Sequence, residues 1–172
     1  MHEPAYVSMS DEEYNKERDV NLKELAEPMP YKWRIQSYSK NKPAASCVAY
    51  IDARDVQQRL DDVCGPENWQ VKYEVINNRL FASIGIKCGE EWVWKQDVGT
   101  ESNMEKEKGQ ASDAMKRAAV NWGVGRFLYS LKIIYLKANA VKSDGVWPHP
   151  VTDDGKRIWD ITAHINEWEL DK

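Results

Sequence analysis

Apolar and polar residues alternate in three short runs between residues 69 and 94, and this pattern limits the folds that the chain can adopt. The alternating apolar residues of the first two runs are Trp69, Val71, Tyr73, Val75, Leu80, Ala82, Ile84 and Ile86. A period of two residues is typical of a half-buried β-strand. Asn77-Asn78 and Gly89 provide turns, and Trp92 begins a third strand. Because short links make neighbouring strands antiparallel, the pattern predicts a three-stranded antiparallel β-meander.

The segment from Glu105 to about Trp122 predicts the clearest helix of the chain. Its apolar residues recur at the spacing that forms one stripe along a helix, namely Ala111, Ala114, Met115, Ala118, Ala119 and Trp122. Gly123 and Gly125 interrupt this helix, and residues 127–131 predict one or two further helical turns. Strands followed by a long helix indicate the α+β class.

Three further elements are predicted before the meander. A capping-box pattern predicts a helix over residues 10–27. Residues 44–51 are small and apolar and predict a short buried strand. Asp52 is placed to cap a second helix, which ends at Gly65.

The net charge of −4 at pH 7 argues against a nucleic-acid-binding protein, but the charge is unevenly distributed. Residues 1–28 contain 8 acids and 3 bases, and residues 153–172 contain 6 acids and 3 bases. Residues 29–152 contain 14 acids and 18 bases, and residues 29–51 contain four bases and no acid. Phosphate responds to the local field of a groove, since charges are screened beyond about 10 Å. The acidic total therefore still allows nucleic-acid binding.

The cysteine content and the hydropathy indicate the compartment. Cys47, Cys64 and Cys88 are widely spaced, which predicts reduced thiols instead of a disulfide framework or a zinc site. No run approaches the roughly 18 apolar residues of a membrane span. Residues 1–4 lack the start of a signal peptide. We therefore expect a cytosolic, nuclear or organellar protein that is neither secreted nor in the membrane.

Patterns typical of catalysis are missing from the sequence. It contains no phosphate-binding Gly-x-x-x-x-Gly-Lys-Ser/Thr loop and no Glu-x-Lys of the kind found in many nucleases. The adjacent acids Asp61-Asp62 and Asp153-Asp154 are typical of solvated surface, and the histidines are scattered. We therefore expect no catalytic residue, no metal site and no cofactor.

Lys116 and Arg117 form an adjacent basic pair on the helix predicted from Glu105 to about Trp122. On a helix they lie about 100° apart, so they flank the apolar stripe. Arginine grips a phosphate through two parallel donors, and lysine adds a mobile point charge. An ordinary solvated helix face is the alternative interpretation of the pair.

Several segments, in order, resemble the Rad52 superfamily of single-strand annealing proteins. Residues 109–119 (GQASDAMKRAA), followed by WG at 122–123 and GRFL at 125–128, are similar to its signature helix. Residues 50–56 and 97–99 resemble the strand and helix before its meander and the end of its third strand. Residues 10–14 are similar to the opening helix of the family, and residues 25–34 to its first DNA-contacting segment. The amino-acid sequence of residues 25–34 favours the prokaryotic and phage branch.

The resemblance implies an architecture and a function. The architecture is a β-β-β-α core, with the meander packed on the long helix, assembled into homo-oligomeric rings or filaments. The function is single-stranded DNA binding and ATP-independent annealing in homologous recombination and double-strand break repair. A recombinase or a single-strand binding protein is the further partner implied. The prokaryotic and phage branch implies the cytoplasm of a bacterium or of a phage-infected cell. The expected division is an acidic helical segment (1–28), the annealing core (29–137), and a loop and C-terminal extension (138–172), in which 157–170 fits a helix or a strand.

The resemblance also implies the DNA-binding residues. Lys116 and Arg117 fall on positions that line the family's positive groove, and Arg34 matches a basic residue before the strand region. The spacing from Arg34 to Tyr50 is longer than in the family, so Lys40 and Lys42 are alternatives for that role. Lys106 and Lys108, earlier on the same helix, are candidates for the rim, and Arg126 is another, for which an internal ion pair is the alternative. Apart from the resemblance, the basic neighbours Lys32 and Arg34 make Trp33 a candidate for stacking on a base.

A protein that coats single-stranded DNA or RNA without annealing it, or a scaffold for another protein, is the alternative function. The acidic ends of the chain and the undecided 157–170 tail suit a surface that docks a partner. A coating protein would bind both complementary strands and leave their pairing rate unchanged or slower.

Overall fold

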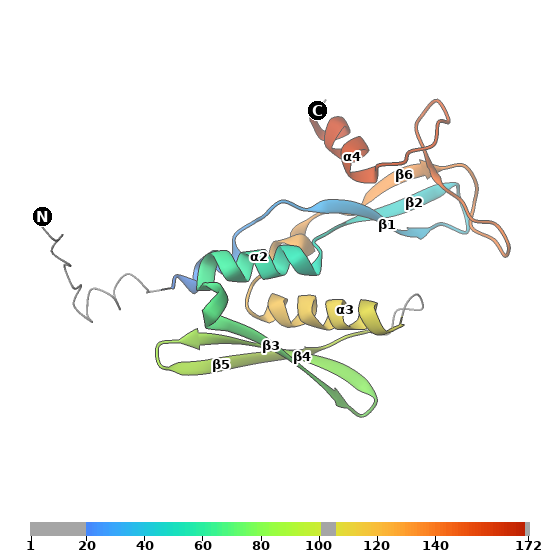
Figure 1. Cartoon of the computed structure of the whole chain (residues 1–172). Helices are drawn as coiled ribbons and strands as arrows, with labels where there is room; N and C mark the ends of the chain where they lie inside the picture. Colours follow the sequence, from blue (N-terminus) through green and yellow to red (C-terminus); the bar gives the residue numbers. More distant parts are fainter. Residues whose placement is uncertain (1–19, 101–105, 171–172) are drawn as a thin grey trace, which may run out of the picture.

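The computed structural model describes residues 20–100 and 106–170, except the side chains of residues 106–108 and 169–170. The elements are η1 (Leu22–Ala26), β1 (Lys32–Tyr38), β2 (Ala44–Tyr50), α2 (Ala53–Cys64), η2 (Pro66–Asn68), β3 (Trp69–Ile76), β4 (Arg79–Cys88), β5 (Glu91–Val98), α3 (Lys106–Asn121), η3 (Arg126–Ser130), β6 (Ile134–Ala138), β7 (Pro150–Val151) and α4 (Ile161–Leu170). From top to bottom of Figure 1, α4 covers a first sheet, α2 and α3 form a middle layer, and a second sheet closes the molecule. The α+β class with antiparallel sheets is confirmed.

The second sheet contains β3, β4 and β5, paired antiparallel in that order. These are the strands expected from the period-two pattern. Asn77 and Asn78 join β3 to β4 with φ angles of 50° and 60°, and Gly89 turns the chain before β5 with a φ of 63°. Asparagine and glycine tolerate this left-handed conformation better than other residues, which explains the position of both turns.

Helix α3 packs on β4 and β5 through the apolar stripe expected from the sequence. The buried members of the stripe are Ala114, Met115, Ala118, Ala119 and Trp122. They meet Ala82, Ile84 and Ile86 of β4 in the larger core of the molecule. The indole Nε1 of Trp122 donates a hydrogen bond of 3.0 Å to the carbonyl oxygen of Ile84, so this large side chain is buried with its polar atom satisfied. None of the helices in the described ranges is long and apolar enough to cross a membrane.

The first sheet has the strand order β1-β2-β6-β7. Only β2 was specified from the sequence; β1 and β6 were not recognised as strands. One face of this sheet carries Trp33 and Cys47, which pack with Ile165 of α4 into a second, smaller core. The hydroxyl of Thr162 in α4 accepts a hydrogen bond of 2.9 Å from the backbone N–H of Trp33. The tail 157–170, which fitted both a helix and a strand, is therefore helical over Ile161–Leu170, because Ile161 and Ile165 cover this face.

The prediction of one helix over residues 10–27 is wrong for residues 20–27. Its start lies outside the described residues, and Leu22–Ala26 form a short 3-10 helix. The side chain of Asn21 accepts a hydrogen bond from the N–H of Lys23, so a new helix begins at this point. Arg59 of α2 donates hydrogen bonds to the carbonyl oxygens of Glu24 (2.6 Å) and Glu27 (3.1 Å) and holds this turn against α2.

Two of the cysteines are core residues. Cys47 and Cys64 are buried, and burial raises the pKa of each thiol to about 11. The thiols are therefore protonated at neutral pH and behave as small apolar side chains.

Helix α2 begins with the cap expected from the sequence. The carboxylate of Asp52 accepts hydrogen bonds from the N–H groups of Arg54 (3.0 Å) and Asp55 (3.2 Å), and Asp55 accepts one from the N–H of Asp52 (2.8 Å). Lys32 of β1 also donates a hydrogen bond of 3.1 Å to Asp52, and this bond is the main reason why the pKa of Asp52 lies below its ordinary value. One carboxylate therefore links β1 to the start of α2.

Replacing Asp52 with alanine should lower the free energy of unfolding by about 1 kcal/mol, because two helix N–H groups lose their acceptor. Asp52→Asn keeps the acceptor and should cost less. Since the folded-state pKa is lowered, the carboxylate's contribution is complete above the ordinary aspartate pKa and disappears as the pH falls through the lowered value. Urea denaturation of the three proteins at pH 7 and at acid pH measures this; an alanine variant as stable as the asparagine variant at pH 7 contradicts it.

Candidate nucleic-acid interface

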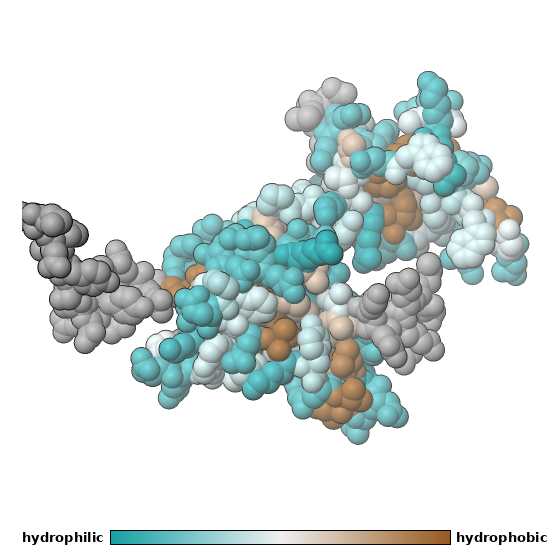
Figure 2. All heavy atoms as spheres, in the orientation of Figure 1, coloured by the Kyte–Doolittle hydropathy of each residue, from teal (hydrophilic) through white to brown (hydrophobic). Residues whose placement is uncertain are grey.

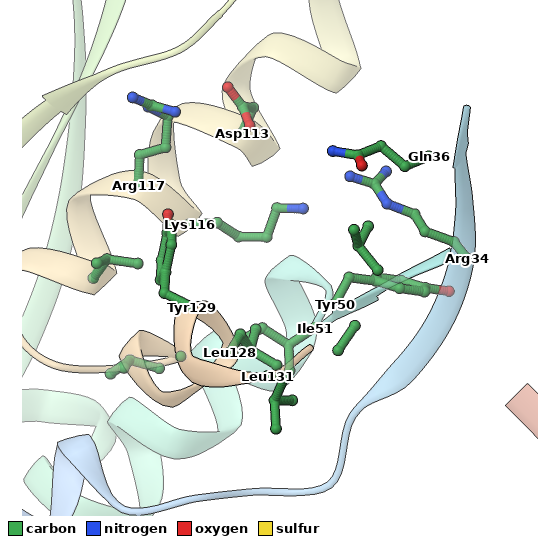
Figure 3. A pocket seen from close by; sticks show the side chains of 15 residues that line it. Arg34, Gln36, Tyr50, Ile51, Asp113, Lys116, Arg117, Leu128, Tyr129 and Leu131 are labelled. Carbon is green, nitrogen blue, oxygen red and sulfur yellow. The ribbon is translucent and has the colours of Figure 1, made fainter. Parts of the chain in front are cut away.

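A hollow of about 520 Å³ separates the first sheet from the middle layer. Its walls come from β1 and β2 on one side and from α3 and η3 on the other (Figure 3). Its charged lining residues are Arg34, Asp113, Lys116 and Arg117. We call it the cationic hollow, because three of these four side chains carry a positive charge.

The local structure explains how each cation reaches the hollow. Along β1, Trp33 and Ile35 face the second core, so Arg34 between them faces the hollow. On α3, Lys116 and Arg117 lie between the buried residues of the apolar stripe and project beside it. Figure 3 shows Lys116 and Arg34 pointing toward one another from opposite walls. The fold thus brings together basic residues that are 82 positions apart in the chain.

The acids near these cations leave them largely free to bind an anion. Asp113 is held by the N–H and the hydroxyl of Thr100, at 2.8 and 2.9 Å. Arg117 lies 3.9 Å from Asp97, measured from Nε to Oδ1, which is longer than a charge-assisted hydrogen bond. Its buried Nε has no hydrogen-bond partner among the described residues. Among the residues that the structure describes, no carboxylate oxygen lies within 4.0 Å of the charged nitrogens of Lys116 or Arg34.

Aromatic side chains border the cationic hollow. The guanidinium carbon of Arg34 lies 5.4 Å from the centre of the Tyr50 ring, in a cation–π contact. Tyr129, in η3, is 76% exposed and lines the opposite side. Neither tyrosine was singled out from the sequence as a site residue. Tyr129 falls in the 127–131 run, where the only signal was helical spacing, and that spacing does not identify an exposed ring.

Of four further predicted DNA-binding residues, two lie away from the cationic hollow and two stay untested. Lys40 and Lys42 lie in the loop between β1 and β2, where Lys42 stands 5.9 Å from the centre of the Tyr135 ring. The side chains of Lys106 and Lys108 are outside the described residues, although their backbone belongs to α3.

Two further predicted site residues, Arg126 and Trp33, have structural roles within the protein. Arg126 donates a hydrogen bond of 2.8 Å to the carbonyl oxygen of Val120. It therefore provides a donor for a carbonyl group at the C-terminal end of α3, instead of forming an internal ion pair. Trp33 is 5% exposed and belongs to the second core, so its ring is not presented for stacking on a base. The side chains of Trp33 and Arg34 therefore lie on opposite faces of β1, and only that of Arg34 faces the hollow.

The paired acids have structural partners. Asp61 accepts a hydrogen bond of 2.7 Å from the indole of Trp69, and Asp153 forms an ion pair of 2.6 Å with Lys137. Asp154 forms an ion pair of 2.9 Å with Lys156. Among the described residues, no group of three or more His, Cys, Asp or Glu side chains is arranged to hold a metal ion.

Comparison with known proteins relates the chain to a family of DNA repair proteins. The family described as Rad52/22 family double-strand break repair protein matches residues 16–83 and 79–147. The single-stranded DNA-binding protein DdrA of Deinococcus radiodurans is 37% identical over 114 residues, which are 63% of this chain and 54% of that protein. DdrA of Deinococcus deserti is 35% identical over 131 residues, 73% of this chain and 65% of that protein. The chain thus spans between half and two thirds of these relatives, and no solved structure matches it significantly.

Replacing Asp97 with asparagine should strengthen the binding of a polyanion, because the carboxylate nearest to Arg117 loses its charge. The asparagine oxygen still accepts the hydrogen bond that the N–H of Val98 donates to Asp97, so the local fold is retained. The gain should be a few-fold, since a half-exposed ion pair is worth less than about 1 kcal/mol. Elution from heparin at increasing salt measures it, with Asp62→Asn on α2 as the charge-matched control. Equal elution of the two variants contradicts the expectation.

Proposed function

Because this chain belongs to the Rad52/22 family of double-strand break repair proteins, we propose that it binds single-stranded DNA in the cationic hollow and anneals complementary strands. The observation that carries the proposal is the convergence of Arg34, Lys116 and Arg117 on one open hollow in a protein whose net charge is −4. An acidic protein that gathers cations at one place produces a local positive field, to which a phosphate backbone responds.

The chemistry of the hollow suits a single strand held by its backbone. Two arginines and a lysine offer donors for phosphate oxygens, and releasing the counterions condensed on DNA gives affinity without regard to sequence. Tyr50 and Tyr129 border the cations, and aromatic rings beside a basic groove are a common means of holding unpaired bases. The names of the DdrA relatives describe them as single-stranded DNA-binding proteins, which supports the same ligand.

Annealing needs no chemical step from the protein. A strand gripped by its phosphates leaves the pairing edges of its bases available to a complementary strand. Base pairing supplies the free energy of the reaction, so ATP is not required. The protein accelerates the reaction by holding strands extended and close together.

We propose further that the protein acts as a homo-oligomer, a ring or a filament. Exposed apolar side chains gather near the β3–β4 turn, and Figure 2 shows hydrophobic residues at this lower end of the molecule. The exposed apolar residues of β3 there are Tyr73, Val75 and Ile76, and Val75 is 70% exposed. Exposed apolar patches of this kind mark interaction sites. Several subunits bound to one strand would turn a weak contact at each hollow into strong binding.

Replacing Lys116 and Arg117 together with alanine should weaken binding of single-stranded DNA and slow annealing, with oligomer size unchanged. Each phosphate neutralised on a single strand contributes about 0.7 to the slope of log affinity against log salt, so the slope should fall by up to about 1.4. Fluorescence anisotropy with a labelled oligonucleotide at several salt concentrations measures both quantities.

The matched control is Arg79→Ala with Lys87→Ala, which removes one arginine and one lysine from β4, away from the hollow. It should bind nearly as well as the wild type. Equal losses in the two double variants would mean that the hollow is not the binding site. A wild type that binds complementary oligonucleotides but does not accelerate their pairing would establish the coating function instead.

Replacing Val75 with glutamate should reduce the size of the oligomer, because a charge cannot be buried cheaply in an apolar contact. Val75 is exposed in the subunit, so the variant should fold normally. Size-exclusion chromatography with light scattering measures the mass, and Glu74→Gln at the neighbouring position is the control. An unchanged mass would place the subunit contact elsewhere.

A further inference from the structure

A second, smaller hollow of about 260 Å³ continues the cationic hollow along the first sheet. Gln36 lines both hollows. One stretch of chain also borders both: Tyr129 and Leu131 line the cationic hollow, and Ile133 and Tyr135 line the second one. The two hollows are therefore successive parts of one trough.

The junction between the hollows lies at an irregularity of β1. Ile35 pairs with Cys47 and Ser37 pairs with Ser46, so Gln36 has no partner residue in β2. An extra residue of this kind bends a strand and redirects its side chains. The bulge explains how one exposed strand contributes Arg34 to the first hollow and Ser37 to the second.

The second hollow differs from the first in chemistry. None of its lining residues is charged: they are Gln36, Ser37, Ser39, Ala44, Ser46, Ile133 and Tyr135. The hydroxyls of Ser37 and Ser46 lie 2.8 Å apart across the β1–β2 pair. Neutral hydroxyls, small side chains and a ring suit a base better than a phosphate.

Tyr135 presents its ring to this hollow because of the alternation of β6. Ile134 and Leu136, its neighbours, face the other side of the sheet and pack against the second core. Tyr135 is 67% exposed, so its ring contributes little to the stability of the fold. Lys42 stands 5.9 Å from the ring centre, which places a cation beside the aromatic face.

We propose that the second hollow is a nucleobase subsite for the DNA strand that occupies the cationic hollow. The ring of Tyr135 stacks on an unpaired base, and Lys42 contacts a phosphate next to that base. The subsite rests on the proposed function, since it takes the same strand further along the trough. It gives Lys42 a place in binding that lies outside the cationic hollow.

The test compares an ordinary oligonucleotide with an abasic one of the same length and charge. Tyr135→Ala should lower affinity for the ordinary strand by about fivefold to a hundredfold, the range for one base stacked on an aromatic ring. It should leave affinity for the abasic strand unchanged, because no base is present to stack. Tyr135→Phe, which keeps the ring, should bind both strands as the wild type does.

The outcomes separate this subsite from the binding function itself. A Tyr135→Ala variant that binds the ordinary strand like the wild type, or that loses affinity equally for both strands, overturns the subsite while single-strand binding stands. A variant with unchanged affinity and a smaller oligomer overturns it as well, and identifies a second copy of the chain as the occupant. A wild type that binds neither strand overturns the proposed function.

Discussion

The packing of α3 on the second sheet is the constraint on which the rest of the structure depends. Small residues on its buried stripe let the helix lie close to β4, and Trp122 closes its end with a hydrogen bond to Ile84. The helix is thereby fixed in rotation as well as in position, since a turn about its axis would expose the stripe. Lys116 and Arg117, which flank the stripe, line the cationic hollow as a consequence.

Periodic segments were predictable from the sequence because one physical rule governs each. The stripe of α3 and the alternation of β4 both follow from burying one face, although the same face of β3 is exposed at Tyr73 and Val75. Asp52 caps α2 because the first N–H groups of a helix need an acceptor. Of the candidate site, helix geometry placed Lys116 and Arg117 beside the stripe, and the resemblance gave this pair and Arg34 a role in binding DNA. The structure brings these three to one hollow.

The rest required tertiary contacts. Trp33 lies between Lys32 and Arg34 in the sequence, which favoured a role in binding, but successive residues of a strand point to opposite faces. Trp33 therefore enters the second core, and only the arrival of α4 makes that face an interior. The same helix, about 30 positions further along the chain, determines which face of β6 is buried. Tyr135 is exposed because its side chain lies on the opposite face. No local pattern carries this information.

Mapping the contacts of bound DNA tests the central claim most directly. An oligonucleotide carrying photoreactive thymines would be bound to the full protein, irradiated, and the modified residues identified by mass spectrometry. The trough predicts adducts in β1 and in the stretch from Tyr129 to Tyr135, which border both hollows. Adducts confined to the second sheet or to the exposed tryptophans Trp147 and Trp159 would contradict it.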